Sequence, residues 1–357
     1  MTPSMDILPK VASRADASYL DFVEGFREYI VGKGADFEER LDAALRAQQS
    51  ARAERFQNVD EICELMHKMP LARLRDRLAR TQQEMKWQKI VSSYEAQRRE
   101  LADELATWDS RGPGRLLLDQ NFVYPPYVNV HFHLQPGGYH KDELSGFFYH
   151  YGTKVFFRGD NDQDALHAKL VSSVPAPRDG RVRRVLDLAC SIGQSTTAFK
   201  QRFAQAQVTG VDYSVPMLRA AHRRAAMLGI EVDFVQGLIE ATHYPDAHFD
   251  ICFAFIVFHE LPMRIIRATV AEAARVTRPG GLFAVFDFAD TRSKSPFQRY
   301  HRWFDARHNG EPYSQDFCDC DLDSILAEHG FEVEAAPVGQ RSGGAGYMSN
   351  WFATRRA

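Results

Sequence analysis

The sequence has few cysteines, and their number and spacing argue against a protein held together by disulfide bonds. The five cysteines are an odd number spread over 357 residues, which argues against a disulfide framework and fits a reducing compartment. Cys318 and Cys320 form a lone C-x-C pair, whereas a structural zinc site needs a second cluster of ligands. We therefore expect neither a disulfide scaffold nor a structural zinc ion.

Long apolar runs and a strong net charge are also missing. No apolar run approaches the roughly 20 residues that span a bilayer, and the first residues, MTPSMDILPK, lack the pattern of a secretory signal. We expect a cytoplasmic protein with no membrane partner. The net charge of -3, from 44 basic and 47 acidic residues, gives no general attraction to phosphate backbones, so nucleic acid is not an expected partner.

The apolar content is high enough for a sizeable core, and a chain of this length favours two structural units over one. Hydrophobic residues make up 45% of the chain. Leu71, Leu74 and Leu78 recur at helical spacing within residues 17–108, and residues 79–108, which lack Pro and Gly, predict a long solvated helix or helical hairpin. Gly112 and Pro113 then end the helical pattern. We expect an all-helical N-terminal region over residues 1–112, through which a homodimer can form.

Residues 113–164 are rich in aromatic residues and histidines, and we expect short extended pieces and turns that connect the two units and line a substrate pocket. If this stretch is a strand, His131 and His133 share a face, and His140 can join them as a third metal ligand. The alternative is that the histidines bond backbone groups while the aromatic residues fill the junction. We expect no metal, and substrate contacts from His131, His133, Tyr139, His140 and Tyr149.

Residues 165–357 alternate apolar strands with helices. The strands are predicted in RVLDLAC, QVTGVDYS, VDFVQG, FDICFAFIVF and GLFAVFDF, with two more at 331–338 and 348–354. Near-continuous apolar strands indicate a parallel sheet that helices cover on both faces. The prediction is an α/β fold, Rossmann-like and doubly wound, with a mostly parallel seven-stranded sheet and the all-helical region before it.

The first of these strands leads into a candidate cofactor loop. Small residues at Ala189, Ser191 and Gly193 allow the backbone to approach a ligand, and the helix that follows offers free amides to a carboxylate. The second strand ends in Asp212, as sites that bind ribose hydroxyls do. A dinucleotide-binding fold is the alternative, but it would need glycines where Ala189 and Ser191 stand.

These segments resemble the class I S-adenosylmethionine-dependent methyltransferases, especially the ubiquinone-biosynthesis-like small-molecule group, over roughly residues 181–287. The matching elements occur in order as LDLACSIGQST, VDYSVPML, VQGLIEATHYPDAHFD, FIVFHEL and RVTRPGG. The sequence departs from the family in two places: Ala189 and Ser191 stand where the family usually has glycines, and Leu238 stands where an aspartate commonly meets the adenine amine. The resemblance implies S-adenosyl-L-methionine as cofactor, held by Asp187, Ala189, Ser191, Gly193, Asp212, Tyr213, Met217, Leu238, Ile239 and Phe255.

The candidate catalytic residues follow the fourth strand of this domain. His259 and Glu260 come directly after it, at the edge where a base for an acceptor proton belongs. The alternative is that His259 packs beside the cofactor and Glu260 caps the next helix. Arg299 lies in a segment that resembles a substrate-covering insertion, and it is expected either to meet an acceptor carboxylate or to lie on a solvated basic face.

Together these features predict an enzyme that transfers a methyl group from S-adenosylmethionine to a nitrogen, oxygen or carbon atom of a small molecule. Two alternatives stay open. One is a sensor or scaffold that binds the cofactor without turnover. The other is an enzyme that uses the bound cofactor in an elimination or rearrangement. The domain division expected is 1–112, 113–164 and 165–357.

Overall fold

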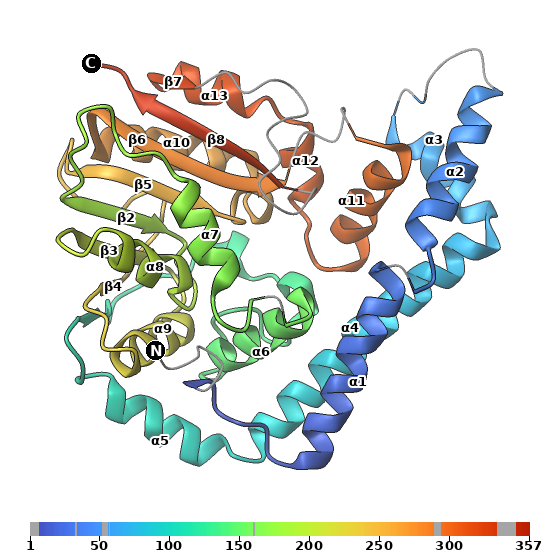
Figure 1. Ribbon diagram of the computed structural model, residues 1–357, viewed down its shortest axis with the longest axis horizontal. Helices are drawn as coiled ribbons and strands as arrows, with labels where there is room; N and C mark the ends of the chain where they lie inside the picture. Colours follow the sequence, from blue (N-terminus) through green and yellow to red (C-terminus); the bar gives the residue numbers. More distant parts are fainter. Residues whose placement is uncertain are drawn as a thin grey trace.

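The structure is a computed structural model that describes residues 7–32, 34–51, 56, 58–159, 161–288, 294–333 and 348–357. Its centre is one mixed sheet with helices on both faces, and an arm of long helices extends along one side of it (Figure 1). This confirms the predicted α/β fold with helices in the N-terminal region. No helix in the described ranges is both long enough and apolar enough to cross a membrane.

Within the described ranges the sheet has eight strands in the order β1-β4-β3-β2-β5-β6-β8-β7. Their bounds are β1 Leu116–Leu117, β2 Arg184–Leu188, β3 Gln207–Asp212, β4 Asp233–Gln236, β5 Phe249–Phe255, β6 Thr277–Phe288, β7 Phe331–Val333 and β8 Met348–Arg355. Among the strands that the structure describes, only β8 is antiparallel to its neighbours. Each of the seven predicted strands has a counterpart, although residues 334–338 of the strand predicted at 331–338 lie outside the described residues. Strand β1 is an eighth, because Leu116 and Leu117 pair in parallel with β4.

Strand β2 occupies the middle of the sheet, and the chain reverses its winding there. It pairs in parallel with β3 on one side and with β5 on the other, so the carboxyl ends of β2, β3 and β5 meet at one edge. In doubly wound sheets this edge, where the strand order reverses, is where ligands bind. The fold thus places the ends of the RVLDLAC, QVTGVDYS and FDICFAFIVF strands side by side.

Two apolar layers hold the helices to the sheet. Helices α7 (Ala165–Ser173), α8 (Gln194–Arg202) and α9 (Val215–Met227) share one buried cluster with one face of the sheet. Helices α10 (Met263–Val276), α12 (Ser314–Asp319) and α13 (Leu322–Glu328) share another with the opposite face. Both faces of β2, β3 and β5 are therefore buried, which explains their near-continuous apolar sequences.

The N-terminal helices form the arm and also contact the sheet domain. They are α1 (Arg14–Val31), α2 (Phe37–Ser50), α3 (Val59–Lys68), α4 (Pro70–Glu95) and α5 (Arg98–Trp108). Helix α11 (Pro296–His308), which follows β6 in the chain, buries Phe297, Tyr300 and Phe304 against α2, α3 and α4. The division of the chain at residues 112 and 164 stays a prediction, because buried clusters join these regions.

The prediction of a solvated helix over residues 79–108 was wrong for much of α4. Gln82, Gln83 and Lys86 are buried there, because α4 packs against α1 on one side and against α6 (Ser145–Phe157) on another. Burial lowers the pKa of Lys86 well below its ordinary value. Polar residues in a helical pattern do not show whether a second helix will cover them.

The aromatic and histidine-rich segment also differs from the expected short strands. Apart from β1 it contains two 3-10 turns, η2 (Pro126–Val128) and η3 (Phe132–Leu134), followed by helix α6. His133 has a φ of 51° and Leu134 a φ of 63°. A strand cannot contain this left-handed pair, so the shared face expected for His131 and His133 does not exist.

Candidate cofactor and acceptor site

The loop between β2 and α8 is tightly wound. Ala189, Ser191 and Gly193 have φ values of 58°, 49° and 73°, so alternate residues take a left-handed conformation that costs a side-chain-bearing residue about 1–2 kcal/mol. A Cβ atom on Gly193 would lie 2.6 Å from the Phe234 ring. The loop therefore needs glycine at 193 for packing, and it tolerates strain at 189 and 191.

Asp212 holds the far side of this loop. At the end of β3, its Oδ2 accepts the Ser191 amide at 2.9 Å and its Oδ1 accepts the Ser214 amide at 2.9 Å. Burial raises the pKa of Asp212 to about 6, although the backbone amides of Ser214 and Ser191 oppose that shift. Each carboxylate oxygen has accepted one hydrogen bond and has a second lone pair for a ligand.

Asp187, at the end of β2, is a second buried carboxyl group beside the loop. Its Oδ2 accepts the Thr196 hydroxyl at 2.6 Å. Burial raises the pKa of Asp187 to about 7, the Thr196 hydrogen bond acts against this, and the nearby charge of Asp212 adds to it. Two buried acids next to each other favour a ligand that carries positive charge.

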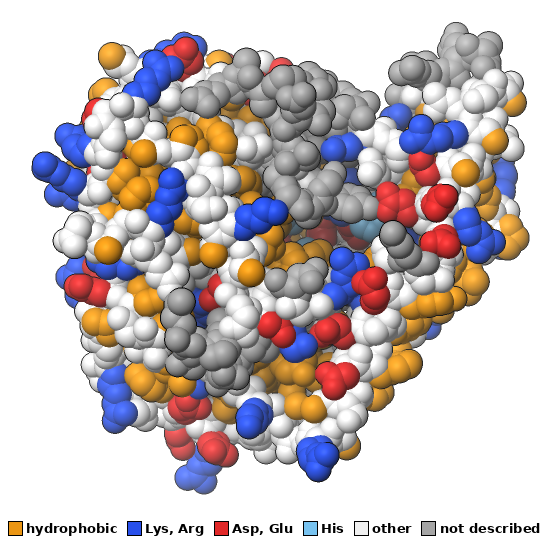
Figure 2. Space-filling view, viewed as in Figure 1, with side chains coloured by type: hydrophobic (Ala, Val, Ile, Leu, Met, Phe, Trp, Pro, Cys, Tyr) orange, Lys and Arg blue, Asp and Glu red, His pale blue; other side chains and the backbone are white. Residues whose placement is uncertain are grey.

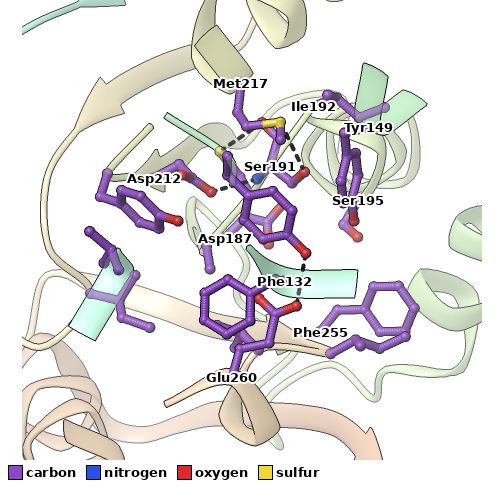
Figure 3. A pocket seen from close by; sticks show the side chains of 18 of the residues that line it. Phe132, Tyr149, Asp187, Ser191, Ile192, Ser195, Asp212, Met217, Phe255 and Glu260 are labelled. Atoms are coloured by element: carbon purple, nitrogen blue, oxygen red, sulfur yellow. Dashed lines mark hydrogen bonds between the residues drawn. The ribbon is translucent and has the colours of Figure 1, made fainter. Parts of the chain in front are cut away.

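A pocket opens between these acids and the segment around Phe132. Figure 3 shows Asp187 near its centre, with Ser191 and Met217 at one end, Asp212 beside them, and Glu260 at the other end. Of the predicted cofactor residues, nine line it: Asp187, Ala189, Ser191, Asp212, Tyr213, Met217, Leu238, Ile239 and Phe255. Tyr213, Met217, Leu238 and Ile239 give one part of this pocket an apolar wall that suits a flat ring.

Glu260 is at the centre of a polar cluster on the other wall. Its Oε1 accepts the Tyr139 hydroxyl at 2.9 Å and lies 3.1 Å from His133 Nε2. His133 Nδ1 lies 3.0 Å from Glu311 Oε1. Burial alone would lower the pKa of His133, but the charges of Glu311 and Glu260 and their hydrogen bonds raise it to about 10.

His259 lies behind Glu260 rather than on the pocket wall. Its side chain is fully buried, and its Nδ1 lies 2.9 Å from Asp287 Oδ1. Asp287 Oδ2 also accepts the Val257 and Phe258 amides at 3.0 and 2.8 Å, which fixes the turn that carries His259. The alternative that Glu260 caps α10 was wrong, since the residue before that helix is Pro262 and Glu260 points to Tyr139 and His133.

Several predicted site residues lie elsewhere. Among the expected substrate residues, His133, Tyr139 and Tyr149 line the pocket. His131 is exposed, and His140 stacks on Tyr124 with ring centroids 4.6 Å apart, so the metal set of His131, His133 and His140 is not brought together. Arg299 directs a guanidinium nitrogen to the Phe56 carbonyl at 3.4 Å. Gly193 is also absent from the wall, because it packs on Phe234 behind the loop.

The residues that sequence reasoning missed in this region include two on the pocket wall and two behind it. Phe132 and Gln194 line the pocket, while Asp287 and Glu311 hold the two histidines. The sequence could have identified Asp287, because this residue lies at the end of the fifth apolar strand of the domain, at the edge where ligands bind. It could not have identified Glu311, since that residue follows α11 and reaches His133 only through the tertiary fold.

Comparison with known proteins assigns the domain. Residues 185–281 match the family model described as a methyltransferase domain. Demethylmenaquinone methyltransferase of Thermus thermophilus is 36% identical over 109 residues, which are 30% of this chain and 47% of that protein. A ubiquinone/menaquinone biosynthesis C-methyltransferase of Bdellovibrio bacteriovorus is 33% identical over 107 residues, 29% of this chain and 44% of that protein.

A relative with a different acceptor matches a longer stretch. The fatty-acid O-methyltransferase of Mycolicibacterium smegmatis is 31% identical over 134 residues, 38% of this chain and 46% of that protein. The chain spans about half the length of these curated relatives. The match to the family model, residues 185–281, includes the loop after β2, Asp212 and the carboxyl ends of β2, β3 and β5. Residues 185–281 therefore match a methyltransferase domain, and in this part of the sequence the chain is similar to methyltransferases of ubiquinone and menaquinone biosynthesis.

Proposed function

We propose that the protein transfers a methyl group from S-adenosyl-L-methionine to a small-molecule acceptor. The observation that supports this most directly is the Asp212 carboxylate, which the amides of Ser191 and Ser214 fix at the pocket with one lone pair free on each oxygen. Two ribose hydroxyls are the donors that such a pair of oxygens can accept. The bound cofactor would supply an electrophilic methyl group on a sulfonium ion.

The residues of the pocket fit this cofactor in charge and in polarity. Asp187 and Asp212 are buried acids with raised pKa values, and a cationic ligand stabilises their charged forms. Tyr213, Met217 and Ile239 offer apolar surface to an adenine ring. Leu238 cannot accept a hydrogen bond from the adenine amine, so we expect adenine to be held here mainly by packing.

We propose that the acceptor binds between the cofactor site and the aromatic segment. Phe132, Tyr139 and Tyr149 line the pocket near Glu260, and a wall of large aromatic residues excludes water from the reacting atoms. Methyl transfer depends mostly on alignment in a dry site. Glu260 is the predicted catalytic residue that faces this space, whereas His259 supports it from behind.

We also propose that the protein forms a homodimer through its helical N-terminal region. Phe22 and Tyr29, seven residues apart on α1, are 59% and 48% exposed, and large exposed apolar side chains on one helix support the predicted homodimer contact. Sedimentation of the full chain beside a Phe22→Ser, Tyr29→Ser variant tests it. A cytoplasmic location stays a prediction.

Calorimetry followed by mass spectrometry tests the activity. We expect binding of S-adenosylmethionine and of its demethylated product, and a new species about 14 mass units heavier after incubation with a metabolite extract, because CH2 is added. Binding without such a species in any extract would favour the sensor or scaffold. A changed metabolite of unchanged mass would favour a rearrangement.

A further inference from the structure

Two histidine–carboxylate pairs converge on Glu260. The first pair is His133 with Glu311, and the second is His259 with Asp287. In both pairs the carboxylate is bonded to Nδ1, and Nε2 faces Glu260 Oε1, at 3.1 Å from His133 and 4.0 Å from His259. The segments come from η3, from η4 (Phe258–Glu260), from β6 and from the turn after α11, so the fold brings them together from distant parts of the chain.

The Nε2 atom of His259 is the group that this arrangement leaves unexplained. It is buried and has no hydrogen-bond partner among the described residues, although a buried polar atom without a partner costs about 1–3 kcal/mol. Glu311 Oε2 is a second such atom. The unpartnered Nε2 of His259 lies beside Glu260 Oε1, so a ligand held in this cluster would give that buried atom a partner.

We propose that His133, His259 and Glu260 bind a first-row divalent transition-metal ion. One donor atom of each of the three residues lies within 4.8 Å of the other two. Metal bonds of about 2.1 Å hold neighbouring donor atoms about 3 to 3.4 Å apart, so small side-chain rotations close the set. The ion would take the place of the proton that joins His133 to Glu260.

The residue types define the class of ion. Two imidazoles with one carboxylate suit iron, zinc or manganese, whereas magnesium and calcium prefer sites built from oxygen ligands. Ligand histidines in metal sites commonly donate their other ring N–H to a carboxylate, which fixes the tautomer and the ring. Glu311 and Asp287 already occupy these positions, and they would therefore be positioning residues.

The proposed ion would be open to the acceptor side of the pocket. His133 and Glu260 line the same pocket as Asp187 and Asp212, and Figure 2 shows histidine and acidic side chains in the hollow between the sheet domain and the helical arm. Three protein ligands leave coordination positions for other groups. If the proposed function holds, an acceptor with an oxygen donor would bind there, but metal binding itself does not depend on methyl transfer.

The test measures metal binding by the full chain without cofactor. After dialysis against a chelator and then into buffer at pH 7.5, Zn²⁺ and Mn²⁺ are titrated separately by calorimetry, and the bound metal is counted by elemental mass spectrometry after desalting. We expect about one ion per chain. His259→Gln and Glu260→Gln should each weaken binding at least a hundredfold, and Glu311→Gln ten- to a hundredfold.

His131→Gln is the matched control, because His131 is exposed in the same segment as His133 and outside the cluster. It should bind metal like the wild type. Should His259→Gln unfold, His133→Gln replaces it, since that side chain is 24% exposed. Less than about one ion per ten chains in the wild type, or equal binding by His133→Gln and the wild type, overturns the proposal. Binding of the demethylated cofactor to the chelated protein tests the proposed function separately.

Discussion

Replacement of Asp212 by Asn changes the proposed ribose contact with little change in shape. The carboxylate oxygens accept the Ser191 and Ser214 amides. In the variant, the new amide group must face one of those two N–H donors and cannot accept from it. One backbone donor and one ribose hydroxyl therefore lose their acceptor, and the remaining contacts lose their charge.

The expected effect follows from the strength of these bonds. A hydrogen bond to a charged group contributes about 1.5–3 kcal/mol. Loss of one such bond and weakening of the other gives about 2–4 kcal/mol, which corresponds to a roughly thirty- to several-hundred-fold weaker binding of the demethylated cofactor. The variant itself should fold, because a neutral group at this buried position also removes the cost of burying charge.

The assay is calorimetric titration with the demethylated cofactor at several pH values. Because the pKa of Asp212 is raised to about 6, its charged form is lost as the pH falls, and wild-type affinity should drop about tenfold from pH 7 to pH 5. Asp187, whose pKa is raised to about 7, lines the same pocket, so some pH dependence should persist in Asp212→Asn, though less than in the wild type. Asp246→Asn, at a side chain 79% exposed, is the control. Equal affinities of Asp212→Asn and Asp246→Asn would refute the ribose assignment.

Three further predictions concern stability, measured as the free energy of unfolding in urea. Gly193→Ala should lose about 2–4 kcal/mol, since its Cβ would lie 2.6 Å from Phe234. Gly180→Ala is the control: at a similar φ of 68° and with nothing within 4 Å of the added Cβ, it should lose only about 1–2 kcal/mol. Equal losses would show that backbone strain, and not the contact with Phe234, causes the effect. Ala189→Gly should gain about 0.5–1 kcal/mol by relief of its φ of 58°, and a loss would mean that the loop is not strained. The pKa of Asp187, about 7, lies above the ordinary 3.8, so its contribution to the free energy of unfolding is present below about pH 4 and is lost as the pH rises to 7. The free energy of unfolding of the wild type should therefore fall relative to that of Asp187→Asn by up to about 4 kcal/mol between pH 4 and pH 8. A difference between the two proteins that stays constant with pH would contradict the raised pKa.

The sheet and its cofactor edge were predictable because local patterns determine them. Apolar strands at regular spacing that alternate with helices indicate a parallel sheet, and the carboxyl ends of parallel strands lie at one edge. Asp187, Asp212 and Phe255 come at or near strand ends, so their positions follow from the strands. The eighth strand escaped prediction because two residues, Leu116 and Leu117, carry no periodicity.

The other wall of the pocket could not be predicted in the same way. Phe132 and His133 lie in a 3-10 turn with left-handed residues that are not glycine, a conformation that depends on tertiary contacts rather than on local preference. Three histidines in one segment suggested one metal set, but the structure separates them. His133 instead meets His259 and Glu311, which lie 126 and 178 positions further along the chain.

Helix α4 explains how such distant segments keep their geometry. The indole nitrogen of Trp87 donates to the His133 carbonyl at 2.6 Å, and Gln83 Nε2 donates to Asn309 Oδ1 at 2.8 Å. Asn309 in turn directs its amide to Glu311 Oε1 at 3.1 Å. One helix of the N-terminal region therefore holds both the histidine and the carboxylate of the first pair, one turn apart on the same face. Because that pair faces Glu260 at the edge of the sheet, the helical arm is part of the site, and a cut through the chain near residue 112 would separate His133 from its support.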